Sequence, residues 1–137
     1  MRVLIDTNIL LDAALSREPF ADAARQVIEA CARGDADGII AAITPLNVFY
    51  VARRTVGNDE AREMVLRLLD LFEVCPLDEM ALRSAYESGQ ADLEDAAQLA
   101  AALAVGVEAI VTRDPRGFAH ASIPVLSPID FLAQLLQ

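Results

Sequence analysis

VLIDTNILLD, residues 3–12, is the stretch that decides the fold of this chain. Its first three residues are an apolar run with β-branched ends, a pattern that favours a buried strand. Asp6, Thr7 and Asn8 follow directly, and residues of this kind form turns and helix caps. We therefore expect a first strand that ends at Asp6.

Outward from this stretch, strand-like and helix-like segments alternate along the chain. Parallel neighbouring strands need crossovers of a dozen or more residues, which the helical segments supply. We therefore expect an α/β fold, a single three-layer α/β/α domain over residues 1–137 with a mostly parallel central sheet of four to five strands. The expected strands are residues 3–5, 38–42, 73–76, 108–112 and 124–126, and the expected helices are residues 21–32, 44–53, 59–72, 78–87 and 92–103, with a last helix that starts at residues 127–128.

Several expected helices have recognisable start residues. Thr44 before Pro45 has the pattern of an N-cap followed by a first-turn proline. Asp78 and Asp92 are expected to cap the helices that follow them. Gly106 is expected to close the helix that Asp92 opens.

Composition limits the environment of the chain. Hydrophobic residues make up 55% and aromatic residues 5%, so the core has to be built from aliphatic side chains. No run approaches the roughly 20 apolar residues that cross a bilayer, and Asp6 interrupts the N-terminus where a signal peptide is apolar. We expect a cytoplasmic protein with no membrane segment, in which Cys31 and Cys75 are reduced core thiols.

The charge pattern excludes several function classes. The formal net charge of −10 repels a phosphate backbone, so the chain is not expected to coat nucleic acid. All eleven basic residues are arginine. The absence of lysine excludes Schiff-base and Walker chemistry, and argues against receiver domains and aspartyl phosphatases, which use a lysine beside their acids.

Acidic residues stand where the fold is expected to form a site. Asp6 ends the first strand and Asp114 lies just past a later one, and sites in parallel sheets form outside the carboxyl ends of the strands. Asp92 and Asp95 share one face of the first turn of a helix. Taken singly, each acid also has an ordinary explanation, as a turn residue or a helix cap.

A divalent metal explains why such acids would gather. Carboxylates that are forced together repel one another unless they are protonated, hydrogen-bonded or neutralised by a hard cation such as Mg²⁺ or Mn²⁺. A metal held in this way activates water and stabilises charge on a phosphodiester. The single histidine, His120, is expected to be an ordinary surface residue.

Three motifs resemble the PIN-domain family, and within it the VapC-type toxin ribonucleases. They are VLIDTNILLD at residues 3–12, DLEDAAQLAAAL at residues 92–103 and AIVTRDPRGF at residues 109–118. The resemblance spans essentially the whole chain. It implies a metal-dependent endoribonuclease in which Asp6, Asp95 and Asp114 are catalytic and bind Mg²⁺ or Mn²⁺ with help from Asp92. The positions that match supporting polar residues are Thr7, Asn8 and Thr112.

Two positions depart from the family pattern. Asn47 stands where members usually carry a glutamate, and it keeps a carbonyl oxygen but removes one negative charge. Gly117 stands where related sequences often have an acid, a loss for which Asp92 or Glu94 would compensate. We therefore expect weaker metal binding. The alternative is a catalytically weakened PIN domain that serves as an RNA- or protein-binding module.

The resemblance also implies partners. Its substrate would be RNA, which we expect Arg113, Arg116 and Arg53 to contact through phosphate groups. A toxin of this type would form a homodimer and would bind a small antitoxin protein in its acidic groove.

Overall fold

The first strand, β1 (Arg2–Ile5), lies at the centre of a five-stranded sheet. The computed structural model describes residues 1–137. The strand order is β3-β2-β1-β4-β5, and every neighbouring pair is parallel. Val3, Leu4 and Ile5 are fully buried, as strands of a sheet covered on both faces should be. The expected parallel sheet of four to five strands is confirmed.

The carboxyl ends of three neighbouring strands form the edge of the sheet on which the acids lie. Leu4 of β1 is in register with Ile39 of β2 and Ile110 of β4. The backbone N–H of Asp6 donates to the Val111 carbonyl at 3.1 Å, which ties the ends of β1 and β4 together. The remaining strand bounds are β2 (Asp37–Ala41), β3 (Glu73–Cys75), β4 (Ala109–Val111) and β5 (Val125–Leu126).

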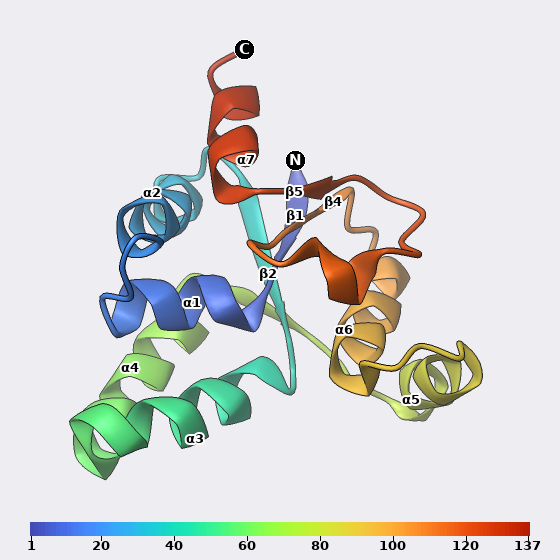
Figure 1. The fold of residues 1–137 in the computed structure, drawn as a ribbon, viewed down its shortest axis with the longest axis horizontal. Coiled ribbons are helices and arrows are strands. Elements are labelled where there is room, and N and C mark those ends of the chain that lie inside the picture. The colour runs from blue at the N-terminus through green and yellow to red at the C-terminus, as the bar shows by residue number, and fades with distance from the viewer.

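Helices cover both faces of the sheet and give the expected three layers (Figure 1). One face is covered by α1 (Thr7–Ala14), α2 (Ala21–Ala32), α3 (Thr44–Val56), α4 (Asn58–Leu71) and α7 (Pro128–Leu135). The other is covered by α5 (Glu79–Glu87), α6 (Leu93–Ala104) and the 3₁₀ turn η1 (Pro115–Phe118).

One helix was not predicted from the sequence. Helix α1 begins directly after Asp6, so the chain turns from strand to helix within one residue. Its residues Ile9, Leu10 and Leu11 are all at most 3% exposed. A helix buried around most of its circumference has no apolar stripe at helical spacing, and this is why the pattern did not reveal it.

The start of α3 differs from the prediction. Thr44 is the first helical residue rather than the N-cap, and Ile43 in the cap position makes no side-chain capping bond. The buried Thr44 hydroxyl lies 3.2 Å from that of Thr7 and joins α3 to α1. The predicted caps Asp78 and Asp92 are confirmed, since their side chains accept from the N–H groups of Ala81 and Asp95. Ser127 caps α7 in the same way by accepting from the Asp130 N–H.

The two cysteines are buried and free, as expected. Burial raises the pKa of the Cys31 thiol to about 11. His120 is exposed, as expected. No helix is long and apolar enough to cross a bilayer.

We predict that Gly38→Ala destabilises the fold by about 1–3 kcal/mol, the usual range for overpacking a core. A Cβ at Gly38 would lie 2.7 Å from two ring carbons of Phe72 and 2.9 Å from the Cys31 sulfur. Urea unfolding measures the loss. Adding Phe72→Leu should recover part of it by making room, and equal stability of Gly38→Ala and wild type would contradict this packing.

Candidate active site

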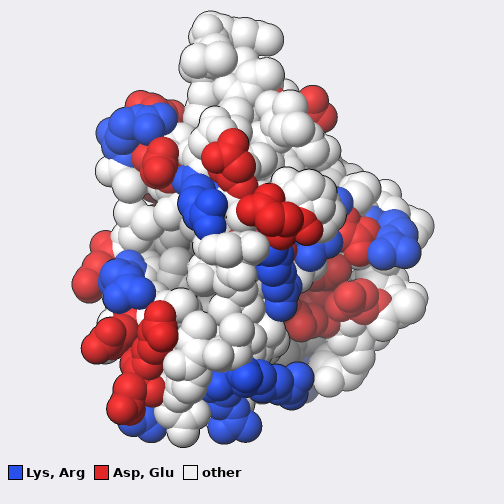
Figure 2. Space-filling model, turned by 60° about the vertical axis from the view of Figure 1, so that its left-hand side comes forward, with Lys and Arg blue, Asp and Glu red and all other residues white.

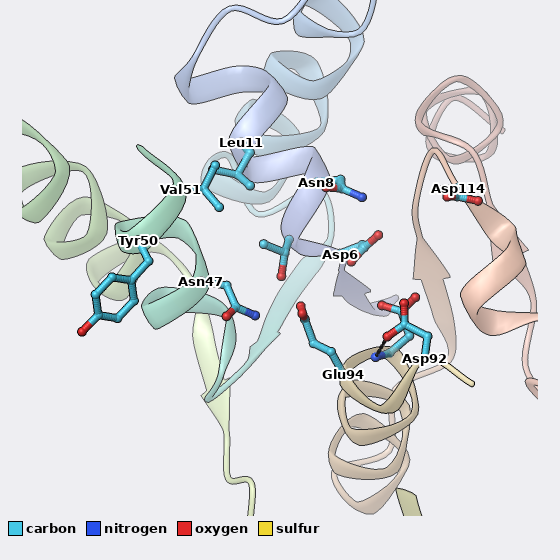
Figure 3. A pocket seen from close by; sticks show the side chains of 11 residues that line it. Asp6, Asn8, Leu11, Asn47, Tyr50, Val51, Asp92, Glu94 and Asp114 are labelled. Atoms are coloured by element: carbon cyan, nitrogen blue, oxygen red, sulfur yellow. Dashed lines mark hydrogen bonds between the residues drawn. The ribbon is translucent and has the colours of Figure 1, made fainter. Parts of the chain in front are cut away.

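Three segments that are distant in sequence meet at the carboxyl edge of the sheet. They are the end of β1, the loop after β4 and the N-terminus of α6, and helices α1 and α3 close the opposite side. Together they line a cavity of about 320 Å³ (Figure 3). Five carboxylates line it, from Asp6, Asp92, Glu94, Asp95 and Asp114.

Asp6 is the buried acid of the site, at 4% exposure. Its Oδ2 accepts a hydrogen bond of 2.8 Å from the Thr112 hydroxyl. Burial nevertheless raises the pKa of Asp6, because leaving water disfavours the charged form more than the hydrogen bonds from Thr112 and Gln98 favour it. Asp6 therefore needs a further positive partner to remain charged at low energetic cost.

The N-terminus of α6 brings more acids to Asp6. Asp92 caps the helix by accepting from the Asp95 N–H at 3.0 Å. Burial raises the pKa of the Asp95 carboxyl to about 7, and the negative charges of Asp6, Asp92 and Glu94 add to the effect. Burial first, and then the charges of Asp92 and Asp6, also raise the pKa of Glu94.

Gln98 is the residue around which these carboxylates gather, and it was not predicted. Its side chain is fully buried, and its Nε2 lies 3.4 Å from Asp95 Oδ1 and 3.5 Å from both Asp6 Oδ1 and Glu94 Oε1. Two amide hydrogens cannot satisfy three carboxylates at such long distances. The signal was a polar residue within the alanine-rich stripe of α6, one turn after Glu94 and Asp95.

No arginine neutralises the inner acids. Of the five acids that line the pocket, only Asp114 forms an ion pair, and the side chains of Asp6, Asp92, Glu94 and Asp95 take part in none. Figure 2 shows Asp and Glu side chains interspersed with Arg over the face that it presents, so no broad basic surface lies there. The acidic pocket thus carries an excess of negative charge, which either protonation of Asp95, whose pKa is raised to about 7, or a bound cation can offset.

Asp114 lies at the border of the pocket rather than among these acids (Figure 3). Arg116 donates to both of its carboxylate oxygens at 2.8 Å, from Nε and Nη2. These hydrogen bonds lower the pKa of Asp114 to about 2. Its backbone N–H donates to the Thr112 hydroxyl at 3.0 Å, so the same threonine links Asp114 to Asp6. Of the three predicted aspartates, Asp6 and Asp95 are brought together and Asp114 stands beside them.

Gly117 leaves the space that Asp95 occupies. A Cβ at this glycine would lie 1.7 Å from Asp95 Oδ2. Any side chain at residue 117, including an acid, would therefore displace the Asp95 carboxylate from where it lies here. The glycine that departs from the family pattern is a condition for the geometry seen here.

The predicted arginines have different surroundings. The Arg113 guanidinium donates to the fully buried Asp12 at 2.5 and 3.2 Å, and these bonds anchor the loop after β4 to α1. The same guanidinium lies 4.3 Å over the Phe20 ring. Arg116 pairs with Asp114. Arg53 lies 4.9 Å over the ring of Tyr50 and forms no ion pair.

The predicted supporting residues Thr7, Asn8 and Asn47 also line the pocket. The Nδ2 of Asn47 is buried and makes no hydrogen bond of ordinary geometry, but the amide is close enough to the Glu94 carboxyl to lower its pKa. It faces the pocket from the first turns of α3, on the side of Glu94 (Figure 3). Three further lining residues, Leu11, Tyr50 and Val51, were not predicted and make this side of the pocket partly apolar.

The donors of the pocket suit a hard cation. No group of three or more His, Cys, Asp or Glu side chains is arranged to hold a metal ion by itself. Mg²⁺ keeps several of its waters, however, and is usually bound through one or two carboxylates. Asp6 and Asp95, which share the Gln98 amide, are such a pair. Because the pocket offers oxygen donors without imidazole or thiolate, it fits Mg²⁺ or Mn²⁺ better than Zn²⁺.

Fold and site together define a class, a parallel α/β domain with an acidic pocket at the carboxyl ends of its strands. The sequence matches the family model described as PIN domain over residues 2–116. The chain belongs to the PIN-domain family, and the resemblance seen in its motifs is confirmed. No curated protein sequence matches this chain.

Solved structures of toxin proteins share the fold. A toxin–antitoxin complex from Klebsiella pneumoniae is 26% identical, with a TM-score of 0.69, over 92% of this chain and 97% of that one. VapC20 from Mycobacterium tuberculosis, described as a toxin that cleaves the sarcin-ricin loop, is 12% identical, with a TM-score of 0.71, over 87% and 95%. DNA-bound VapBC from Salmonella typhimurium is 17% identical, with a TM-score of 0.69, over 93% and 98%.

We predict that Asp95→Asn makes the metal-free protein more stable at pH 8, by a few degrees in Tm. The pKa of Asp95 is raised from 3.8 to about 7 by folding, so the native state binds the proton more tightly than the unfolded chain. Wild-type stability therefore falls as the pH rises through this window, and the advantage of the variant grows. Thermal unfolding in EDTA between pH 4 and 8 measures both. Asp70→Asn, at an exposed position on α4, is the control. The prediction is contradicted if the difference in Tm between Asp95→Asn and wild type is no larger at pH 8 than at pH 4.

Proposed function

We propose that this protein is a metal-dependent endoribonuclease and the toxin of a toxin–antitoxin pair, built as one PIN domain over residues 1–137. The observation that carries the proposal is the group of carboxylates around Gln98, which no arginine neutralises. Membership of the PIN-domain family and the fold shared with toxin structures support it.

In this proposal Asp6 and Asp95 hold Mg²⁺ or Mn²⁺, while Asp92 beside them and Asp114 at the border add negative charge. When bound, such a metal lowers the pKa of a water ligand and stabilises charge on the phosphodiester. Thr112 fixes the Asp6 carboxylate through its 2.8 Å hydrogen bond. Gln98 holds the carboxylates of α6 and β1 at a common distance. Asp6 is buried, so its own carboxylate is shielded from bulk water.

Arginines supply the positive charge that an acidic protein needs in order to hold RNA. Arg53 forms no ion pair and lies on α3 beside the pocket, so it is available to a phosphate group. Arg116 is 88% exposed beside Asp114 and can exchange that acid for a phosphate. Arg113 is bound to Asp12, and a phosphate contact from it would use its remaining N–H groups.

Partners follow from the relatives. The structure from Klebsiella pneumoniae is a toxin–antitoxin complex, and the structure from Salmonella typhimurium is DNA-bound VapBC. We propose that this chain likewise binds a small antitoxin protein over the acidic pocket, forms a homodimer and acts in the cytoplasm.

A second candidate is a PIN domain with weakened catalysis that serves as an RNA- or protein-binding module. It is favoured by Asn47, which places an amide where the family usually has a glutamate, and by the lack of three convergent metal-binding side chains.

We predict that the protein, freed of any antitoxin, cleaves RNAs with unpaired loops when Mg²⁺ or Mn²⁺ is added. Asp6→Asn and Asp95→Asn should lower the rate on the order of 10²–10³-fold, as loss of a group that stabilises transition-state charge does. Gel analysis of labelled RNA measures cleavage. Asp70→Asn should cleave like wild type. No cleavage by wild type, or equal cleavage by wild type and Asp6→Asn, would sink the nuclease proposal.

Metal binding gives a separate prediction. Mn²⁺ at a hundred times its Kd should stabilise the wild type by about 2.7 kcal/mol, because it binds only the folded state. The gain should vanish in Asp95→Asn and persist in Asp70→Asn. Calorimetric titration and thermal unfolding measure it. A flat titration of the wild type would favour the binding module.

A further inference from the structure

The pocket has a second half that the acids do not explain. Across from them, α1 and α3 line it with Leu11, Tyr50 and Val51. Asn47, Tyr50 and Val51 are three and four residues apart, so they share one face of α3. Figure 3 shows Asn47 between Glu94 and the Tyr50 ring, which lies at the outer end of the pocket. A ligand that starts at the acids and runs outward passes Asn47 and reaches Tyr50.

The Tyr50 ring is exposed yet held in place. It is 51% exposed, so part of the ring is open to a ligand in the pocket. Phe49 packs against it edge to face with 5.2 Å between ring centroids, and the Arg53 guanidinium lies 4.9 Å over it. A fixed aromatic ring with an arginine stacked on it is the kind of surface on which unpaired nucleobases stack.

Asn47 supplies an amide that the protein satisfies only in part. No hydrogen bond of its buried Nδ2 has ordinary geometry, although the amide lies close enough to Glu94 to lower the pKa of that carboxyl, and it has two N–H groups, so one remains for a ligand acceptor. The edges of nucleobases carry such acceptors, as carbonyl oxygens and ring nitrogens. Since the same amide faces the pocket between the acids and Tyr50, it is placed to meet the base edge of a nucleotide whose phosphate lies at the acids.

We propose that Asn47, Tyr50 and Arg53 form a subsite for one unpaired nucleobase, next to the phosphodiester bound at the acids. The substrate would then be single-stranded RNA or an RNA loop, because a paired base inside a duplex cannot reach a side chain in this way. This inference rests on the proposed nuclease function for its substrate, but the base subsite is testable by binding alone. It also gives Asn47 a role in recognition in place of a lost acidic role.

Tyrosine fluorescence tests the subsite without any turnover. The chain has no tryptophan and two tyrosines. Tyr86→Phe leaves Tyr50 as the reporter, and Tyr50→Phe leaves Tyr86, which is 70% exposed on α5, as a matched control for absorption by the RNA. Each variant also carries Asp6→Asn, which under the proposed function slows cleavage enough for binding to be measured before turnover. The probe is a five-nucleotide single-stranded RNA in Mg²⁺, compared with an abasic oligonucleotide of equal length.

Saturable quenching of Tyr50, but not of Tyr86, by the RNA is expected, with little response to the abasic strand. Equal quenching in both variants, or equal responses to the RNA and the abasic strand, would overturn the subsite. The absence of quenching would also overturn it. If, in addition, Tyr50→Ala changes the oligomeric state in sedimentation but not RNA binding, this face of α3 is a protein contact.

Kinetics separate the subsite from the nuclease proposal. Tyr50→Ala should raise KM for the RNA about tenfold with a smaller change in kcat, and Tyr50→Phe should restore it, because stacking needs only the ring. Arg53→Ala should raise KM more than Arg67→Ala, which removes the same charge from the exposed side of α4. Cleavage by Tyr50→Ala at the wild-type KM would overturn the subsite and leave the nuclease standing. Quenching without cleavage by the wild type would support the subsite and refute the nuclease.

Discussion

Mutual repulsion of carboxylates around one buried amide is the constraint on which the site depends. Asp6, Glu94 and Asp95 each approach Gln98 Nε2 to 3.4–3.5 Å, and none has an arginine partner. Their pKa values are all raised, with burial as the main cause. A fold in which the acids were only surface caps would spread them apart into water. Here the sheet and α6 hold them together, which stores electrostatic energy that a bound cation would release.

The surrounding structure makes this crowding possible through small residues and fixed anchors. The alanines of α6 let the helix lie close to the sheet, and Gly117 leaves the space for the Asp95 carboxylate. The Thr112 hydroxyl bonds to the carboxylate of the buried Asp6 and to the backbone of Asp114, so one hydroxyl links the inner acid to the acid at the border. The ion pair of the buried Asp12 with Arg113 fixes the loop after β4 to α1. Arg113 and Arg116 thus form their ion pairs at the edge of the pocket, and no arginine pairs with the acids at its centre.

The pocket is consequently divided into an acidic half and a partly apolar half. The acidic half comes from β1 and α6, and the other comes from α1 and α3. A nucleotide has the same division, with a charged phosphate and a flat base. Asn47 and Tyr50 lie three residues apart on one face of α3, so the helix brings both to the same half of the pocket.

The sequence by itself determined the parallel α/β fold, because strand-like runs alternate with periodic helices, and it placed Asp6, Asp95 and Asp114 near one edge of the sheet. It did not reveal α1, whose buried residues Ile9 to Leu11 lack a one-sided pattern. Only the tertiary structure decided that Gln98 joins Asp6 to Asp95, that Arg116 binds Asp114, and that Gly117 makes room for Asp95. These are contacts between segments far apart in sequence or choices among side-chain positions, and local periodicity carries no information about either.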